Sequence, residues 1–270
     1  TVIAGVTESV QPTLAFRYSQ GDVQQFGSLP DFPSCDLTYG AVTRDGESVY
    51  GACVSEDQQS SRAFRWTEAT GLVALSNASC EMKSVFAISA SGTATFGIGS
   101  CDSASGLVRW TNGASGMSVS TAPAGLQVEG VHGTSHDGGA AIGALRQASS
   151  SQSAGTSGLA FRWSDTSGVE LLPLTSGQSY SVANAIAPSG EVIVGKAGQA
   201  DNAAKAVLWD EAGQLELETY LESQGVDLQG VELNTAQDVV VRDGTILILG
   251  YVDAANFSGA WLARIPLVRP

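Results

Sequence analysis

His132 and His136 are the only two histidines, and their spacing binds zinc when it falls on a helix. Here both residues align with strand positions of a repeat that runs through the chain. Four residues of a strand span ~13 Å, whereas zinc ligands each place a nitrogen ~2 Å from the metal. A tight turn could bring His136 near Asp137, but that gives only two ligands. We therefore expect no metal site and no histidine-driven acid–base catalysis.

Carboxylates are the next candidates for chemistry, because the chain has 27 Asp and Glu residues. A glycosidase needs two of them ~5–9.5 Å apart in a cleft, and the sequence does not single out a pair. The strand–helix serine elbow and the phosphate-binding and dinucleotide-binding fingerprints are missing. We expect no catalytic residue, no cofactor and no enzymatic activity, and we keep a glycan-active enzyme as an alternative.

The four cysteines form two pairs, and each pair flanks a turn that contains glycine. Residues on either side of such a turn face each other in an antiparallel hairpin. This predicts disulfides between Cys35 and Cys53 and between Cys80 and Cys101, which would place the chain in an oxidising compartment. Buried free thiols are the alternative, and a metal site is disfavoured because no C-x-x-C spacing occurs.

Four arginines recur at one position of the repeat and form the candidate ligand-binding set: Arg17, Arg65, Arg109 and Arg162. A ring of guanidinium groups would bind an anion or an acidic glycan. Alternatively, each arginine pairs with a carboxylate or a carbonyl of its own repeat or of the next one. We favour this second interpretation, because a side chain present in nearly every repeat is usually architectural and the net charge is −14.

The composition excludes several classes of partner. A net charge of −14 repels nucleic acid and anionic lipid. No apolar run approaches the ~20 residues that span a bilayer, so we expect no membrane insertion. An acidic surface with few lysines is typical of an extracellular protein. The chain begins at Thr1 without methionine, from which we expect that a leading segment was removed or trimmed.

Glycines inside apolar stretches reveal a repeat of about 46 residues. A turn glycine precedes each of them by five or six residues in all copies except the first. Glycine within a strand permits close backbone approach. The in-strand glycines, spaced by 46, 46, 46, 52 and 55 residues, are Gly5, Gly51, Gly97, Gly143, Gly195 and Gly250.

A second element of the repeat reads Ala-Phe-Arg-Trp, as at 63–66 and 160–163. Side chains alternate along a strand, so Phe64 and Trp66 share one face and would pack between neighbouring units. We expect the same of Trp110, Phe161, Trp163 and Trp209. Turn signals divide each unit into four short strands, the pattern of a β-propeller blade.

The fold class expected is therefore an all-β propeller forming a single domain over residues 1–270. It would have about six four-stranded blades, the terminal blade being incomplete; five blades plus extra strands is the alternative. Ring closure would bring Thr1 and Pro270 close together. Apolar residues within 215–228 indicate a short helix or an irregular excursion.

The Ala-Phe-Arg-Trp-Thr element, the strand that follows it and the Ile-Ser-x-x-Gly hairpin together resemble the HAF repeats of bacterial extracellular proteins. The resemblance covers residues 1 to about 266. The chain departs from the family pattern at Leu208, which replaces the arginine. It departs again in the last copy, at 260–263, where the phenylalanine and the arginine of the motif are missing. Membership of this family would imply a secreted or surface-anchored protein, and it implies nothing about activity.

These observations favour a non-catalytic binding or assembly module that is secreted or displayed at the surface of a bacterial cell. A glycan or another surface protein is the expected partner. Two alternatives remain. One is a glycan-binding lectin or a glycan-active enzyme. The other is a structural subunit that self-associates through its terminal strands, because a bare strand edge offers unpaired N–H and C=O groups.

Overall fold

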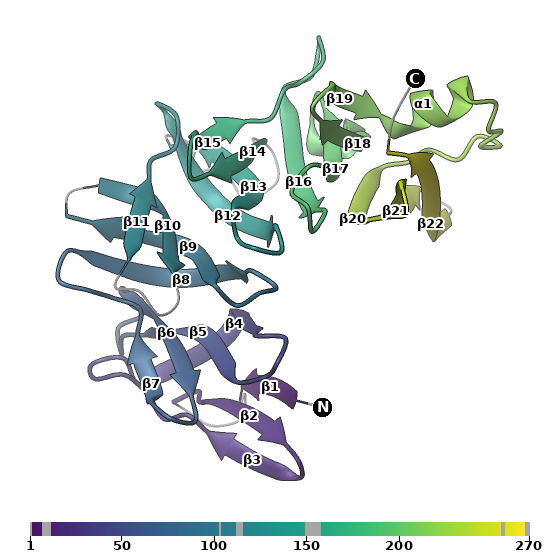
Figure 1. The fold of residues 1–270 in the computed structure, drawn as a ribbon. Coiled ribbons are helices and arrows are strands. Elements are labelled where there is room, and N and C mark those ends of the chain that lie inside the picture. Colours follow the sequence, from purple (N-terminus) through teal and green to yellow (C-terminus); the bar gives the residue numbers. More distant parts are fainter. Residues whose placement is uncertain are drawn as a thin grey trace. The chain divides into compact units, whose positions relative to one another are not determined.

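The computed structural model describes residues 2–6, 12–102, 104–111, 116–148, 158–254 and 257–267 (Figure 1). The chain divides into two compact units, Thr1–Thr121 and Ala122–Pro270. The described residues of each unit form three antiparallel sheets, and consecutive strands lie side by side in every sheet. We number the sheets 1 to 6 in chain order.

The first unit contains sheets 1 to 3. Sheet 1 consists of β1 (Val2–Val6), β2 (Ala15–Ser19) and β3 (Asp22–Gln25). Sheet 2 consists of β4 (Ser34–Val42), β5 (Ser48–Val54), β6 (Ser61–Thr67) and β7 (Gly71–Ala74). Sheet 3 consists of β8 (Cys80–Ile88), β9 (Ala94–Cys101), β10 (Ala104–Thr111) and β11 (Met117–Ser120).

The second unit contains sheets 4 to 6. Sheet 4 consists of β12 (Leu126–Thr134), β13 (Ala140–Gln147), β14 (Leu159–Ser164) and β15 (Gly168–Leu171). Sheet 5 consists of β16 (Tyr180–Ile186), β17 (Ile193–Gly198), β18 (Lys205–Asp210) and β19 (Gly213–Glu216). Sheet 6 consists of β20 (Thr235–Arg242), β21 (Thr245–Ala254) and β22 (Phe257–Pro266).

The predicted repeat matches the sheets, and the two terminal sheets are incomplete as expected. Among the described residues, sheet 1 begins with the strand that carries Gly5 and includes no equivalent of β4 or β8. Sheet 6, as far as the structure describes it, ends with the strand that carries Trp261 and includes no equivalent of β7 or β11. The expected proximity of Thr1 and Pro270 concerns residues that lie outside the described ones.

Each in-strand glycine faces backbone or an aromatic ring of its own sheet. A Cβ on Gly143 would overlap the carbonyl oxygen of Gly130, which belongs to a β-bulge in β12, and would lie 2.9 Å from the ring of Phe161. In sheet 2, a Cβ on Gly51 would lie 2.5 Å from the carbonyl oxygen of Asp36. The close approach predicted from sequence therefore arises within one sheet, where the first strand bulges over the second.

In sheets 2 and 5, aromatic side chains of the third strand pack onto the preceding sheet. Phe64 and Trp66 share a buried cluster with Ala15 and Phe26 of sheet 1. The rings of Phe26 and Trp66 stack with centroids 4.3 Å apart. Trp209 is buried too, and its indole N–H donates to the carbonyl of Pro173, which follows sheet 4.

Trp110 differs from the other aromatic residues of this set, because it is only partly buried. The opposite face of sheet 2 contacts sheet 3. Tyr50 and Ala63 of sheet 2 share a cluster with Met82 and Val85 of sheet 3. The alternation of side chains along each strand therefore assigns one face to each neighbouring sheet.

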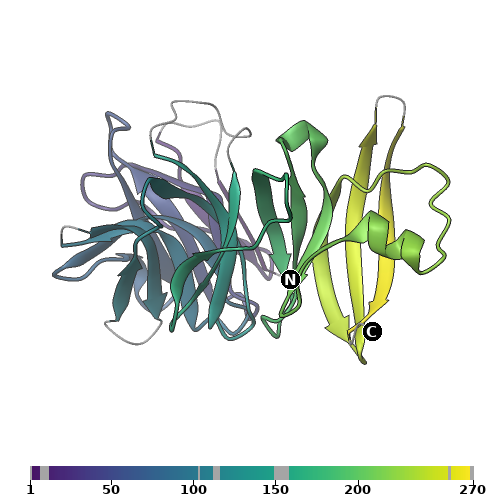
Figure 2. The same ribbon diagram turned by 90° about the horizontal axis from the view of Figure 1, so that it is seen from above.

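A short helix, α1 (Leu217–Ser223), and a single 3₁₀ turn, η1 (Asp201–Ala203), interrupt the second unit. Figure 2 shows α1 beside the strands of that unit. Leu217 and Tyr220 bury the apolar side of α1 in the core between sheets 5 and 6. Lys205 pairs with Glu218 of α1 at 3.3 Å. The helix expected within 215–228 is therefore present. No helix in the described part of the chain is long and apolar enough to cross a membrane.

Candidate functional site

The two ends of the sheets differ in the length of their connections. Each four-stranded sheet has two ends. The end where its first strand starts is called the loop end, and the opposite end is called the turn end. The longest connection at a loop end is 217–234, and the longest at a turn end is 187–192. Binding residues are found disproportionately on loops that a rigid scaffold positions. The loop ends are therefore where a ligand site is expected.

Tight turns at the turn end are stabilised by a hydroxyl and a carboxylate. In the turn between β12 and β13, the Ser135 hydroxyl donates to Asp137 at 2.7 Å, and the Gly139 N–H donates to the same carboxylate at 2.9 Å. These two hydrogen bonds lower the pKa of Asp137 below its usual value. The turn of sheet 2 has the same arrangement, in which the Thr43 hydroxyl and a backbone N–H donate to the carboxylate of Asp45. These hydrogen bonds lower the pKa of Asp45 below its usual value.

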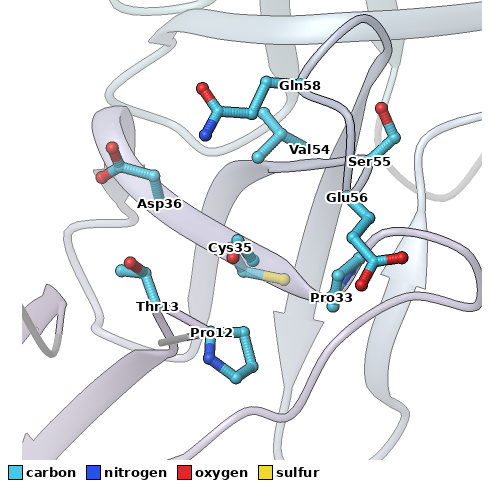
Figure 3. Close-up of a pocket in the computed structure, with 10 residues that line it drawn as sticks. Pro12, Thr13, Pro33, Cys35, Asp36, Val54, Ser55, Glu56 and Gln58 are labelled. Carbon is cyan, nitrogen blue, oxygen red and sulfur yellow. The ribbon is translucent and has the colours of Figure 1, made fainter. Parts of the chain in front are cut away.

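A hollow of about 490 Å³ opens at the loop end of sheet 2 (Figure 3). Its polar side chains come from the start of β4 and from the loop between β5 and β6. Figure 3 shows the carboxylates of Asp36 and Glu56 on opposite sides of the hollow, with Cys35 between them. The residues that line it are Pro12, Thr13, Pro33, Ser34, Cys35, Asp36, Val54, Ser55, Glu56 and Gln58.

Local hydrogen bonds and a disulfide hold this hollow in shape. The Ser55 hydroxyl donates to Asp57 at 2.6 Å, and the N–H of Ser60 donates to the Ser55 hydroxyl at 3.0 Å. Those bonds set the loop that presents Glu56 and Gln58. On the other side, the N–H of Cys35 donates to the carbonyl of Thr13 at 2.8 Å and joins the segment before β2 to β4.

A second hollow, of about 350 Å³, meets the first at Asp36 and Val54, which line both. It extends toward sheet 3, where Lys83 and Ser84 of β8 contribute to it. We call the two hollows together the loop-end groove. The remaining residues that line the second hollow are Ala52, Ser61 and Val85.

The structure pairs the four cysteines as the sequence predicts. Cys35 and Cys53 face each other across β4 and β5, and Cys80 and Cys101 face each other across β8 and β9. In both cases the bond joins the first strand of a sheet to the second near the loop end. The first disulfide therefore lies directly under the loop-end groove, and the spacing around the turns was sufficient to find it.

Arg17 and Arg65, two of the four candidate arginines, line one further hollow of about 510 Å³ at the turn end. Arg17 donates to the carbonyl of Gly46 in the following sheet at 3.0 Å. Arg65 donates to the hydroxyl of Ser48 at 2.9 Å. Arg109 and Arg162 do not line this hollow. The arginine set is thus not gathered into one described site, and Arg17 makes the contact to the next repeat that the architectural interpretation predicts.

Carboxylates surround the two arginines of this hollow. Asp45, Glu47 and Glu68 line it together with Arg17 and Arg65. Three carboxylates beside two guanidinium groups leave no positive excess to attract an anion. Binding of an anion or of an acidic glycan through the candidate arginines therefore stays a prediction without support from the charges of the hollow.

The histidines lie apart from one another and contact the next sheet. His132 is in a bulge of β12, and its Nδ1 lies 2.7 Å from the carbonyl oxygen of Ala183. His136 lies beyond that strand, in the turn, and its backbone N–H donates to the carbonyl of Pro188. Both residues thus join sheet 4 to sheet 5. Within the described ranges, no three His, Cys, Asp or Glu side chains are grouped closely enough to hold a metal.

The loop-end groove was missed by sequence reasoning. None of its polar residues belongs to the repeated aromatic or glycine motifs, and Asp36 is separated from Lys83 by a whole repeat. The one signal available was the irregular length of the segments between motifs, since variable connections indicate a variable, ligand-facing end.

Comparison with known proteins gives no relative at the level of sequence. No protein-family model matches the chain, and no curated protein sequence matches it either.

Solved structures do match the fold. The β-propeller domain of the Trilobed protease from Pyrococcus furiosus has an open velcro topology and aligns with a TM-score of 0.54 and 9% identity. The alignment covers 100% of this chain and 82% of that one.

Two further structures align over most of this chain. The tricorn protease aligns with a TM-score of 0.56 and 9% identity, over 94% of this chain and 28% of that one. A puromycin-hydrolyzing peptidase from Mycobacterium tuberculosis aligns with a TM-score of 0.53 and 10% identity, over 98% of this chain and 43% of that one. At these identities the likeness concerns the fold alone. The chain is an all-β protein of the β-propeller fold, and its six sheets are the blades.

Proposed function

We propose that this protein is a secreted or cell-surface β-propeller that binds a ligand, without catalysis, in the loop-end groove of sheets 2 and 3. The observation that carries the proposal is a pair of hollows that share Asp36 and Val54 in their linings, at the loop end of sheet 2. The groove is open to solvent, and a disulfide holds its first strand.

The location rests on independent observations. Disulfides persist in oxidising compartments, and both pairs of cysteines are bonded. The resemblance to the HAF repeats would place the protein outside a bacterial cell, and the excess of acidic residues agrees with this.

The binding proposal is tested with immobilised glycan and peptide arrays. Fluorescently labelled wild-type protein should bind a subset of spots, and the double variant Asp36→Asn, Glu56→Gln should lose them. Glu68→Gln is the matched control, because Glu68 lies at the turn end of the same sheet. Binding that survives the double variant, or no binding on either array, would overturn the proposal. Mass spectrometry of a bound ligand after incubation should find it intact, and cleavage would overturn the non-catalytic role.

A second candidate function, self-assembly, has its own support in the terminal sheets. In sheet 1, Ile3, Tyr18 and Val23 form a row across all three strands, and all three side chains are exposed. In sheet 6, Leu249 and Leu262 lie opposite each other and are exposed as well. Each row occupies a face that a neighbouring sheet covers elsewhere in its unit. A second copy of the chain would offer the apolar surface that such rows bury.

Light scattering during size-exclusion chromatography tests assembly. The wild-type protein should gain mass as its concentration rises, and Leu262→Asp should remain a monomer. Leu171→Asp is the control, since Leu171 is similarly exposed but lies in sheet 4, outside the two exposed rows of the terminal sheets. A wild-type monomer at every concentration would rule out this candidate.

A further inference from the structure

We infer that copies of this chain assemble head to tail, with the outer face of sheet 6 in one copy packed onto the outer face of sheet 1 in the next. The outer face of sheet 6 carries Leu249 and Leu262, and that of sheet 1 carries Ile3, Tyr18 and Val23. This inference rests on self-assembly, the second candidate function, and names the two surfaces that meet.

The contact between sheets 5 and 6 shows how an apolar pair on one sheet is covered by the next sheet. Val194 and Leu208 lie opposite each other in β17 and β18, and both are completely buried. Ile248 and Ala263 lie opposite each other in β21 and β22 and belong to the same core cluster. One cross-strand apolar pair of sheet 5 therefore shares its core with one cross-strand apolar pair of sheet 6.

The outer face of sheet 6 repeats the covered pair of sheet 5. Leu249, like Val194, directly precedes the in-strand glycine of its repeat. Leu262 lies opposite Leu249, as Leu208 does in the earlier pair. Leu262 is nevertheless 60% exposed, and Leu249 is exposed as well. The first four repeats carry arginine at the position of these two opposite leucines. A leucine stands there in sheet 5, where sheet 6 buries it, so the leucine of sheet 6 indicates a surface that is covered in the same way.

Sheet 1 presents the matching surface, because its outer residues are the counterparts of the pair that covers sheet 5. Ile3 and Ile248 each lie two residues before the in-strand glycine of their repeat. Tyr18 lies opposite Ile3, and Ala263 occupies the same place in sheet 6. Ile3 is 53% exposed. No charged residue stands on this face at any described position of β1, β2 and β3. The face can therefore bury the leucine pair of sheet 6 without desolvating a charge.

Sheet 2 shows what this kind of face becomes when another sheet packs onto it. Val49 and Trp66 lie at the positions of Ile3 and Tyr18, and both are buried. Their core cluster includes Ala15 of sheet 1. Burial of Ile3 and Tyr18 in the same way needs an apolar face of the kind that sheet 6 exposes.

Unlike faces meet in these interfaces, and this determines the orientation of the copies. Sheet 1 packs onto sheet 2, sheet 2 onto sheet 3 and sheet 5 onto sheet 6, each time through two different faces of the repeat. A contact between different faces leaves one of each kind free on a pair of copies, so further copies add to form a ring or a filament. A symmetrical dimer would join two identical faces, which none of these three interfaces does.

Two charged variants test the orientation, because each blocks one face. Leu262→Asp blocks the outer face of sheet 6, and Ile3→Asp blocks that of sheet 1. Each variant alone should keep the mass of a single chain in light scattering, at a concentration where the wild type assembles. In an equimolar mixture the mass should double, since the intact sheet 1 of one variant meets the intact sheet 6 of the other. No larger particle should form.

Matched controls come from exposed apolar residues outside both faces. Val73 of sheet 2 and Leu171 of sheet 4 are similarly exposed, so Val73→Asp and Leu171→Asp should each assemble as the wild type does. Val23→Asp blocks the outer face of sheet 1 from another strand and should replace Ile3→Asp in the mixture with the same result. The circular dichroism of each variant verifies that it is folded.

The outcomes separate the orientation from self-assembly itself. If the wild type assembles but the mixture keeps the mass of a single chain, or if either variant alone still dimerises, the head-to-tail assignment is wrong while self-assembly stands. Particles larger than a pair in the mixture would also refute the assignment, because a third surface would then be needed. A wild-type monomer at every concentration would refute both.

Discussion

Sheets 4 and 1 carry the same aromatic motif, on β14 and on β2, and yet the motif has a different environment in each. Trp163 in β14 is 2% exposed, whereas Tyr18, its counterpart in β2, is 38% exposed. The flanking residues are nearly identical, Ala-Phe-Arg in both strands. The difference shows that the repeat specifies the strand, while the packing around the strand determines whether its aromatic side chain is buried.

The strands that carry the repeated in-strand glycine, β13 and β1, show a parallel difference. Gly143 in β13 faces the bulge of β12 and the ring of Phe161. Among the described residues, Gly5 in β1 faces only the ring of Phe16, 2.7 Å from where a Cβ would stand, and no strand lies before β1 in sheet 1. A ring can rotate away from an added methyl group, but a hydrogen-bonded backbone carbonyl has far less freedom.

The largest effect is expected at the buried aromatic residue. Trp163→Ala should lower the free energy of unfolding by about 3–5 kcal/mol through the cavity that it leaves, measured by urea denaturation. Tyr18→Ala should cost less than about 1 kcal/mol, as is usual for exposed positions. If Tyr18→Ala destabilises the protein as much as Trp163→Ala, the aromatic face of sheet 1 is covered in solution.

Loss of a disulfide ranks next. The double variant Cys80→Ser, Cys101→Ser opens a loop with a sequence separation of 21 residues. It should reduce stability by about 2–4 kcal/mol, because the unfolded chain is no longer constrained. The measurement is thermal unfolding of the variant beside the wild-type protein, both without reductant. Peptide mapping of the non-reduced wild type should find Cys80 linked to Cys101, and four free thiols would contradict the structure.

The glycine comparison predicts a smaller effect. Gly143→Ala should destabilise the protein by about 1–3 kcal/mol, the usual cost of overpacking, and Gly5→Ala should cost clearly less. Chemical denaturation of the two variants measures both. Equal costs would mean that the bulge of β12 relaxes as easily as a single ring, and that the first strand does not decide the need for glycine.

The smallest effect concerns the acidic turns and depends on pH. Hydrogen bonds from Gly139 and Ser135 lower the pKa of Asp137 below 3.8 in the folded protein. A lowered pKa stabilises the fold above the pKa of the unfolded chain, and this stabilisation disappears as the pH falls through the folded value. Asp137→Asn should therefore lower the melting temperature slightly at pH 7 and hardly at all once the pH has fallen below the folded pKa of Asp137.

Asp243 provides the control for this titration in a terminal sheet. Asp243 is exposed in the turn of sheet 6. In the described part of the chain, its one ion pair is with Arg242. Asp243→Asn should leave the melting temperature nearly unchanged at both pH values. A loss at pH 7 equal to that of Asp137→Asn would show that the Ser135 hydroxyl contributes nothing to the turn.

Much of the architecture was predictable from the sequence, because it depends on contacts between residues close in the chain. The spacing of Gly51, Gly97 and Gly143 indicated repeated hairpins, and the turns between the cysteines indicated which pairs would bond. Both disulfides join directly opposite residues of adjacent strands. Hairpin pairing is local, so a turn position and an alternating pattern determine it.

The loop-end groove was not predictable, because its residues come from three different sheets. Asp36, Glu56 and Lys83 carry no shared spacing, and they meet only because sheets 2 and 3 pack face to face. For the same reason the sequence could name Arg17 as a repeated residue but not its acceptor, the carbonyl of Gly46, which lies in the next sheet.

The sequence by itself therefore determined the strands, their order within each sheet, the disulfide pairs and the faces that carry aromatic residues, since each depends on a period of two or on a nearby turn. Only the tertiary structure decided which of those faces is covered, as the contrast between Trp163 and Tyr18 shows. It also decided which charges line the groove. These outcomes depend on packing between sheets, which no single repeat encodes.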